Sequence, residues 1–142
     1  MLWQSEIKPL DAELLKRVAQ SMVDLAVIRD LLIKGANSNA TNIFGYTPLM
    51  IVAEKNRADI ADLLMLHSAC IDQRNYQGNT AMHLALFKGN IELAKFLQAK
   101  GGAADIKNNK GVTAAVFLDY FEEDCYAYTA QQSNIKVTKR IG

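Results

Sequence analysis

The sequence predicts an all-α fold, a solenoid of stacked helix-turn-helix units joined by β-hairpin-like turns. The first observation is a fixed period: Gly45, Gly78 and Gly111 are 33 residues apart, and a threonine follows each of them two residues later. The second observation is that apolar residues recur at helical spacing after these glycines. One short helix pair cannot cover its own apolar face, so the units must stack to create a core.

Each unit opens with a turn and a first helix. The three glycines follow polar tips that begin with Asn42, Asn75 and Asn108, where a chain reversal favours a residue that tolerates positive φ. The hydroxyl of the following threonine is placed to cap the first helix, and Pro48 has the φ that a helix start favours. The predicted caps are Thr47, Thr80 and Thr113.

A second helix follows in each full unit. Gly101 stands where a left-handed residue closes the last helical turn, whereas Ser68 takes that place one period earlier. We therefore expect the earlier helix to end less regularly. The apolar positions of the second helices are Ala58, Ile60, Ala61, Leu63 and Leu64 in one unit and Ile91, Leu93, Ala94, Phe96 and Leu97 in the next.

These units resemble the ankyrin repeat. Thr-Pro-Leu at 47–49 and Thr-Ala-Met-His-Leu-Ala at 80–85 are similar to the start of its first helix. Gly-Ala-Asn-Ser-Asn at 35–39 looks like its Gly-Ala-Asp-x-Asn ending. The resemblance implies an ankyrin-repeat solenoid that presents its turn tips and inner helices as one concave surface, which binds another protein.

The resemblance divides the chain, as a single ankyrin-repeat domain, into five segments. Terminal repeats are expected to be atypical, because one of their faces meets water. We expect Asp11 to cap the first helix, Trp3 to fold over the open end, and 122–128 to form a tyrosine-bearing capping helix. The segments are 1–39, an N-terminal capping repeat; 40–72 and 73–105, two full repeats; 106–132, a degenerate C-terminal capping repeat; and 133–142, a loose tail.

Composition excludes several classes of function. The 142 residues are half hydrophobic with a formal net charge of +1, which is not the basic footprint of a nucleic-acid-binding protein. The first residues lack a secretory signal, and no run of about 18 apolar residues is present to cross a membrane. Cys70 and Cys125 are too few for a disulfide framework. We therefore expect a cytoplasmic protein that binds neither nucleic acid nor membrane, with signal-independent export left open.

Candidates for chemistry are few, and we predict no enzyme, no metal site and no cofactor. His83 stands at the histidine of the ankyrin Thr-Pro-Leu-His motif, and the resemblance implies that it joins a hydrogen-bond network with neighbouring turns. His67 and Cys70 are three residues apart but lack the further ligands that zinc requires. Asp72 and Asp105 are expected to accept hydrogen bonds from backbone N–H groups in the loops.

A protein-binding site is predicted on the turn tips and at the ends of the first helices. Tyrosine and phenylalanine beside lysine and asparagine match the composition of binding hot spots. The alternative, for Phe44, Phe87 and Phe121 and also for Tyr46 and Tyr76, is that they fill gaps between repeats. The predicted binding residues are Ile43, Phe44, Tyr46, Lys55, Tyr76, Gln77, Asn79, Phe87, Lys88, Lys110, Tyr120 and Phe121.

Two functions fit the sequence. The first is a non-enzymatic adaptor, monomeric on its own, that holds one protein partner in its concave face. The alternative is a structural subunit that self-associates or assembles through its C-terminal repeat, over residues 117–128. Sedimentation at several concentrations separates them, since only the second predicts association through the last repeat.

Overall fold

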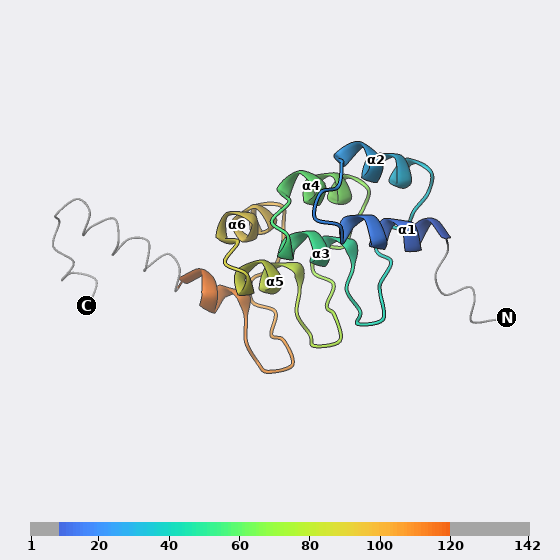
Figure 1. Ribbon diagram of the computed structural model, residues 1–142. Helices are drawn as coiled ribbons and strands as arrows, with labels where there is room; N and C mark the ends of the chain where they lie inside the picture. The colour runs from blue at the N-terminus through green and yellow to red at the C-terminus, as the bar shows by residue number, and fades with distance from the viewer. Residues whose placement is uncertain (1–8, 120–142) are drawn as a thin grey trace, which may run out of the picture.

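The computed structural model describes residues 9–119 of the 142-residue chain, and these residues form two rows of helices. The helices are α1 (Pro9–Val18), α2 (Leu25–Ile33), α3 (Pro48–Glu54), α4 (Ala58–Leu66), α5 (Ala81–Phe87) and α6 (Ile91–Ala99). Figure 1 shows α1, α3 and α5 as an inner row and α2, α4 and α6 as an outer row, with the turns projecting beyond the inner row. A helical segment over 114–119 continues the inner row.

Three turns of one geometry project from the stack: the first turn (42–45), the second turn (75–78) and the third turn (108–111). In the first turn, Asn42 N donates to Tyr46 O and Gly45 N donates to Asn42 O, both at 3.0 Å. The other two turns repeat both bonds at 2.9 Å. Their glycines have φ of +81°, +80° and +79°, a left-handed conformation that favours glycine. The 33-residue period is therefore confirmed in the backbone.

The asparagine that opens each turn holds it together. Asn42 Oδ1 accepts hydrogen bonds from Phe44 N at 2.9 Å and from Tyr46 N at 3.0 Å. Asn75 and Asn108 repeat this pattern with the amides two and four residues later. The polar tip is thus an Asx turn stacked on a backbone turn.

The threonine caps of α3 and α5 are confirmed. Thr47 Oγ1 accepts from Met50 N at 3.3 Å, and Thr80 Oγ1 accepts from His83 N at 3.4 Å. Pro48 stands at the first helical position, as predicted. Each cap satisfies a backbone N–H that has no partner within the helix.

The predicted cap of the first helix is wrong. Helix α1 begins at Pro9, so Asp11 lies within its first turn. Asp11 is buried, and its Oδ1 accepts a hydrogen bond from Asn37 N at 2.7 Å. Its carboxylate therefore ties the helix to the loop that ends the first unit, a contact 26 residues away in sequence.

The outer helices α4 and α6 end alike. Ser68 and Gly101 have φ of +70° and +105°. The amide after each donates to the carbonyl five residues back, at 3.0 Å after Ser68 and at 2.9 Å after Gly101. The expectation of a less regular end at Ser68 is wrong, because the serine adopts the left-handed conformation at a strain of about 1–2 kcal/mol.

One core runs along the described part of the stack, from Leu14 in α1 to Leu118 in the last helical segment. Leu64 and Leu97 are completely buried, which confirms the predicted register of the second helices. Helix α3 packs against α1 and α5 in its own row and against α4 in the outer row. Each unit therefore obtains its dry interior from its neighbours.

Several predicted features lie outside the described residues. They include Trp3, Tyr120, Phe121, the helix over 122–128 and the tail over 133–142. Between residues 9 and 119, helices are the only regular elements, and none of them is long and apolar enough to span a membrane.

Candidate functional site

The turn tips form a row of exposed side chains. Ile43, Phe44 and Tyr76 are 77%, 62% and 72% exposed. Hydrogen bonds join the turns that carry them: Tyr76 N donates to Phe44 O at 3.4 Å, and Asn109 N donates to Gln77 O at 3.0 Å. Asn109 Nδ2 also donates to Tyr76 O at 2.9 Å. The backbone that carries Phe44 and Tyr76 is thus held in place by hydrogen bonds from the next turn.

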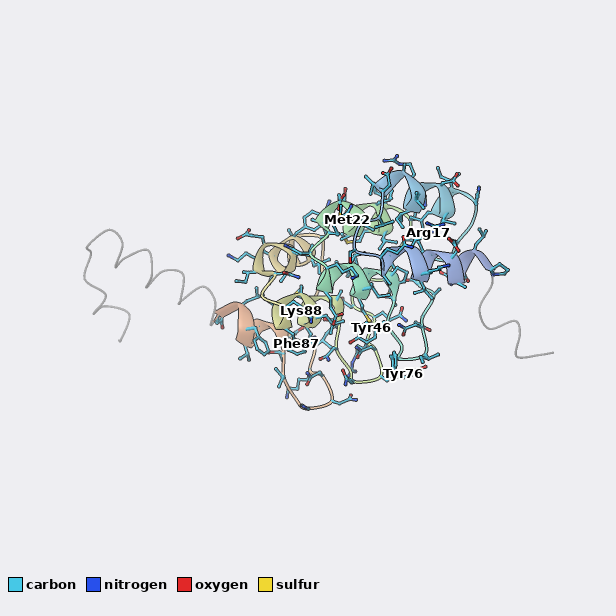
Figure 2. The ribbon with its side chains drawn as sticks, viewed as in Figure 1. Arg17, Met22, Tyr46, Tyr76, Phe87 and Lys88 are labelled. Atoms are coloured by element: carbon cyan, nitrogen blue, oxygen red, sulfur yellow. The ribbon has the colours of Figure 1, made fainter. Side chains whose placement is uncertain are left out.

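A groove lies between the turn tips and the inner helices. It consists of two hollows of about 490 and 360 Å³, which share Tyr46, Glu54, Tyr76 and Gln77 and are therefore continuous. Figure 2 shows Tyr46 and Tyr76 on the turn side of the inner helix row. The other residues that line the groove are Ala19, Asn42, Phe44, Ile51, Lys55, Asn79, Leu84, Phe87, Asn108, Asn109 and Lys110.

The Tyr76 ring rests on Gly45. A Cβ atom on Gly45 would lie 2.7 Å from Tyr76 Cδ1 and 2.9 Å from Tyr76 Cε1, closer than packed carbon atoms approach one another. The position therefore requires glycine for space as well as for its φ of +81°. The absence of a side chain at Gly45 thus lets the Tyr76 ring of the following unit lie across the tip of the first turn.

Tyr46 joins the two hollows and is partly buried. Burial raises the pKa of its phenol above the ordinary value, and the Glu54 carboxylate adds to that rise. The hydroxyl therefore keeps its proton at neutral pH and is able to donate a hydrogen bond. The middle of the groove thus combines an apolar ring, a hydroxyl donor and a carboxylate acceptor.

The Phe87 side chain contacts the neighbouring unit and also lines the groove, and it is 45% exposed. Its ring makes an edge contact with Phe117, with centroids 5.3 Å apart, and lies 6.1 Å from the His83 ring. One part of the ring fills a gap between units and another part lines the groove. Phe44 is more exposed, so it offers more surface to a partner.

Tyr46 and Asn79 occupy the same position in successive units, 33 residues apart. Asn79 is buried, and its Oδ1 accepts a hydrogen bond from Asn108 Nδ2 at 2.8 Å, which joins the second turn to the third. One period earlier, Asn75 Nδ2 faces a tyrosine position and makes no hydrogen bond within the described residues, although it is buried. The asparagine–asparagine hydrogen bond that joins the second and third turns is therefore absent where the chain carries Tyr46, and only a weaker contact of Asn75 with the phenol stands in its place.

His83 joins two units, as the motif implied. Its Nε2 lies 2.9 Å from Val112 O, and its Nδ1 lies 3.1 Å from Thr80 N. A carbonyl only accepts and an amide only donates, so Nε2 carries the proton and Nδ1 is the acceptor. Both ring nitrogens of this buried neutral histidine are used for structure.

The comparisons with known proteins agree with this geometry. A family model described as ankyrin repeats, in three copies, matches residues 15–110. The chain belongs to the ankyrin repeat family. Ankyrin repeats are generally protein–protein interaction modules, and the family is generally non-enzymatic.

Individual ankyrin relatives are similar over part of their length. An ankyrin repeat protein of fowlpox virus is 36% identical over 107 residues, which is 73% of this chain and 31% of the viral protein. The mouse B-cell lymphoma 3 protein homolog is 34% identical over 79 residues, 55% of this chain and 18% of that protein. Zebrafish inversin is 32% identical over 77 residues, 54% of this chain and 8% of inversin. The chain thus spans less than a third of each of these relatives.

The remaining predicted residues take regular places in the ankyrin array. Lys55 and Lys88 are exposed at the ends of α3 and α5, one period apart, and Gln77 and Lys110 are exposed in the turns. All of them except Lys88 line the groove. The predicted set omits several lining residues, among them Ile51 and Leu84 on the inner helices. These two are one period apart, so the repeat was the signal that could have found them.

Other polar residues of the ankyrin array serve the loops. Asp72 Oδ1 accepts from Ala103 N at 2.9 Å, and Asn39 Oδ1, one period earlier, accepts from Cys70 N at 2.7 Å. The predicted loop role of Asp72 is confirmed. In the part of the chain that the structure describes, no three histidine, cysteine or acidic side chains gather as metal ligands.

Proposed function

We propose that this ankyrin repeat chain binds a segment of a partner protein along the groove, with Phe44, Tyr46 and Tyr76 at the centre of the contact. These side chains line one continuous groove. Aromatic residues are enriched in the cores of protein interfaces and among the residues that dominate binding energy. The hydrogen bonds between turns fix the backbone before binding, which reduces the entropy lost on association.

The observation that carries the proposal is the tyrosine at position 46. Asparagine at the equivalent position 79 completes an inter-turn hydrogen bond, whereas the buried Asn75 amide nitrogen has only a weak contact with the Tyr46 phenol and no hydrogen bond of standard geometry within the described structure. A buried donor without a partner costs about 1–3 kcal/mol. A residue that lowers local stability at an exposed groove is expected where binding to a partner, and not folding, determines which amino acid stands there.

The proposal is tested by quantitative affinity capture with matched variants. Tyr46→Asn and Tyr76→Ala remove aromatic groups from the groove. Leu66→Ala removes an apolar side chain from the outer helix α4 that is 75% exposed, close to the 72% of Tyr76. Partner proteins identified by mass spectrometry should be captured by the wild type and by Leu66→Ala. The groove variants should lose about 2 kcal/mol or more of binding, which is roughly thirtyfold in affinity.

The control also defines the contrary result. A partner that is captured equally by the wild type and both groove variants, but lost with Leu66→Ala, would place the binding surface on the outer helices. Circular dichroism of each variant confirms that the helices remain folded.

A second candidate function is assembly through the last described helix. Val116 stands two periods after Met50 and one period after His83, which are both 1% exposed, yet Val116 is 60% exposed. An exposed apolar residue at a position that is otherwise interior favours continuation of the stack by another chain. Sedimentation velocity should then show association that Val116→Lys abolishes, and a monomer at every concentration would exclude this candidate.

A further inference from the structure

The groove is chemically polarised along the stack. In its half near the first turn, Phe44 at the tip and Ile51 on the helix behind supply apolar surface, and the charges of Glu54 and Lys55 there are opposite in sign. Its half near the third turn is lined by Lys110. Three further exposed cations belong to the adjoining turn segments and the end of α5, outside the groove lining: Arg74, Lys88 and Lys107. The chain as a whole has a net charge of only +1, so this is a local arrangement of charge.

The cations of this half lack carboxylate partners within the described residues. Arg74 donates to two carbonyl oxygens, Gly78 O at 3.2 Å and Lys107 O at 3.0 Å, so its positive charge is fixed between turns but not neutralised. No ion pair joins Lys88, Lys107 or Lys110 to a described carboxylate. In the described structure, Glu54 is the acidic residue that lines the groove, and it lies at the junction of the two hollows.

We infer that the groove takes an extended protein segment with an apolar or aromatic anchor over the first and second turns and acidic side chains over the third turn. This inference rests on the proposed function and specifies the chemistry of the partner. Complementary charge chiefly sets the orientation and the association rate, while the anchor supplies most of the affinity. The asymmetry of the groove therefore fixes the direction in which the segment lies.

The geometry of the stack also fixes a spacing. Neighbouring packed helices lie about 8–10 Å apart, so successive turns are separated by a similar distance. An extended segment advances about 3.3–3.6 Å per residue. The segment thus advances by about three residues per turn, which places its acidic residues about three to six positions from the anchor.

The experiment is a selection of random 16-residue peptides displayed on phage against the full chain, followed by fluorescence anisotropy with the enriched peptides. Enriched sequences should combine an aromatic or aliphatic residue with aspartate or glutamate about three to six positions away on one side. Their binding should be lost in Tyr46→Asn. Lys110→Glu and Lys88→Glu should each weaken binding by about two- to fivefold, and high salt should reduce this difference.

A matched control and three contrary outcomes separate the claims. Arg29→Glu reverses an exposed charge on the outer helix α2 and should leave peptide affinity unchanged. Peptides that require Tyr46 but carry no excess of acid would overturn this inference and leave the proposed function standing. Peptides that bind independently of Tyr46 would overturn both. Equal, lysine-dependent binding of a single-stranded DNA oligomer would reassign the basic half to a nucleic acid.

Discussion

Replacing Tyr46 with asparagine should separate folding from recognition in this chain. Tyr46 O accepts from Asn42 N as Asn79 O accepts from Asn75 N, so position 46 occupies the same place in the first turn as position 79 in the second. There, Asn79 Oδ1 accepts from the asparagine of the next turn at 2.8 Å. In Tyr46→Asn, the new amide oxygen should reach Asn75 Nδ2 in the same way.

The expected change in the free energy of unfolding is the sum of two opposing contributions. Satisfying a buried donor recovers about 1–3 kcal/mol. Loss of a partly buried ring costs about 1 kcal/mol, roughly half of what a fully buried aromatic side chain contributes. The free energy of unfolding of Tyr46→Asn should therefore lie between the wild-type value and about 2 kcal/mol above it. Tyr46→Ala loses the ring without supplying an acceptor, so it should be about 1–3 kcal/mol less stable than Tyr46→Asn.

Urea denaturation followed by far-UV circular dichroism measures the difference, provided that all three proteins have the same m-value. The result that would refute the reasoning is an asparagine variant that is no more stable than the alanine variant. The Asn75 amide would then have a partner in solution, and Tyr46 would carry no structural cost.

Three further changes test the stack, the turns and one ion pair. Leu97→Ala removes a fully buried side chain and should cost about 2–5 kcal/mol, whereas Leu66→Ala should cost less than about 0.5 kcal/mol; equal melting temperatures would show that the register of the outer helices is wrong. Gly78→Ala and Gly111→Ala should each introduce a backbone strain of about 1–2 kcal/mol, because both glycines have positive φ. Only at Gly78 would the new Cβ also lie 2.7 Å from a backbone nitrogen, so Gly78→Ala should be the less stable of the two in urea denaturation. Asp59→Asn should cost less than about 1 kcal/mol near neutral pH, because a hydrogen bond from the arginine two residues earlier lowers the pKa of this exposed carboxyl. The folded-state pKa lies below the unfolded value of about 3.9, so the ionised carboxylate stabilises the fold above that pH. This stabilisation is lost as the pH falls through the folded-state pKa. A loss of stability in Asp59→Asn that persists in strong acid would therefore contradict the assignment.

The repeat architecture was predictable from the sequence because it depends on local signals. The turn glycines and the threonine caps each act within a few residues, and the structure confirms the glycines at their 33-residue period and the caps at Thr47 and Thr80. The buried positions of α4 and α6 followed from helical spacing alone. These signals recur in each unit, so the same helix-turn-helix structure can be predicted for each unit separately.

Features that depend on contacts between units were not predictable in this way. Asp11 was predicted to be a helix cap because acidic residues near the start of a helix commonly cap it. Its hydrogen-bond partner is instead the amide of Asn37 in a later loop. The relation of Tyr46 to the Asn75 amide appears only when the first and second turns are placed side by side. Groove residues such as Ile51 were not predicted, because periodicity identifies an apolar face without showing where neighbouring turns leave it uncovered.

The contact between Gly45 and the Tyr76 ring has a consequence for genetics. A saturation screen scored for partner capture should return Gly45 among its strongest hits, although a residue without a side chain offers the partner nothing to hold. Any larger residue there displaces the ring of the next unit, so the phenotype would be that of a tyrosine lost 31 positions downstream.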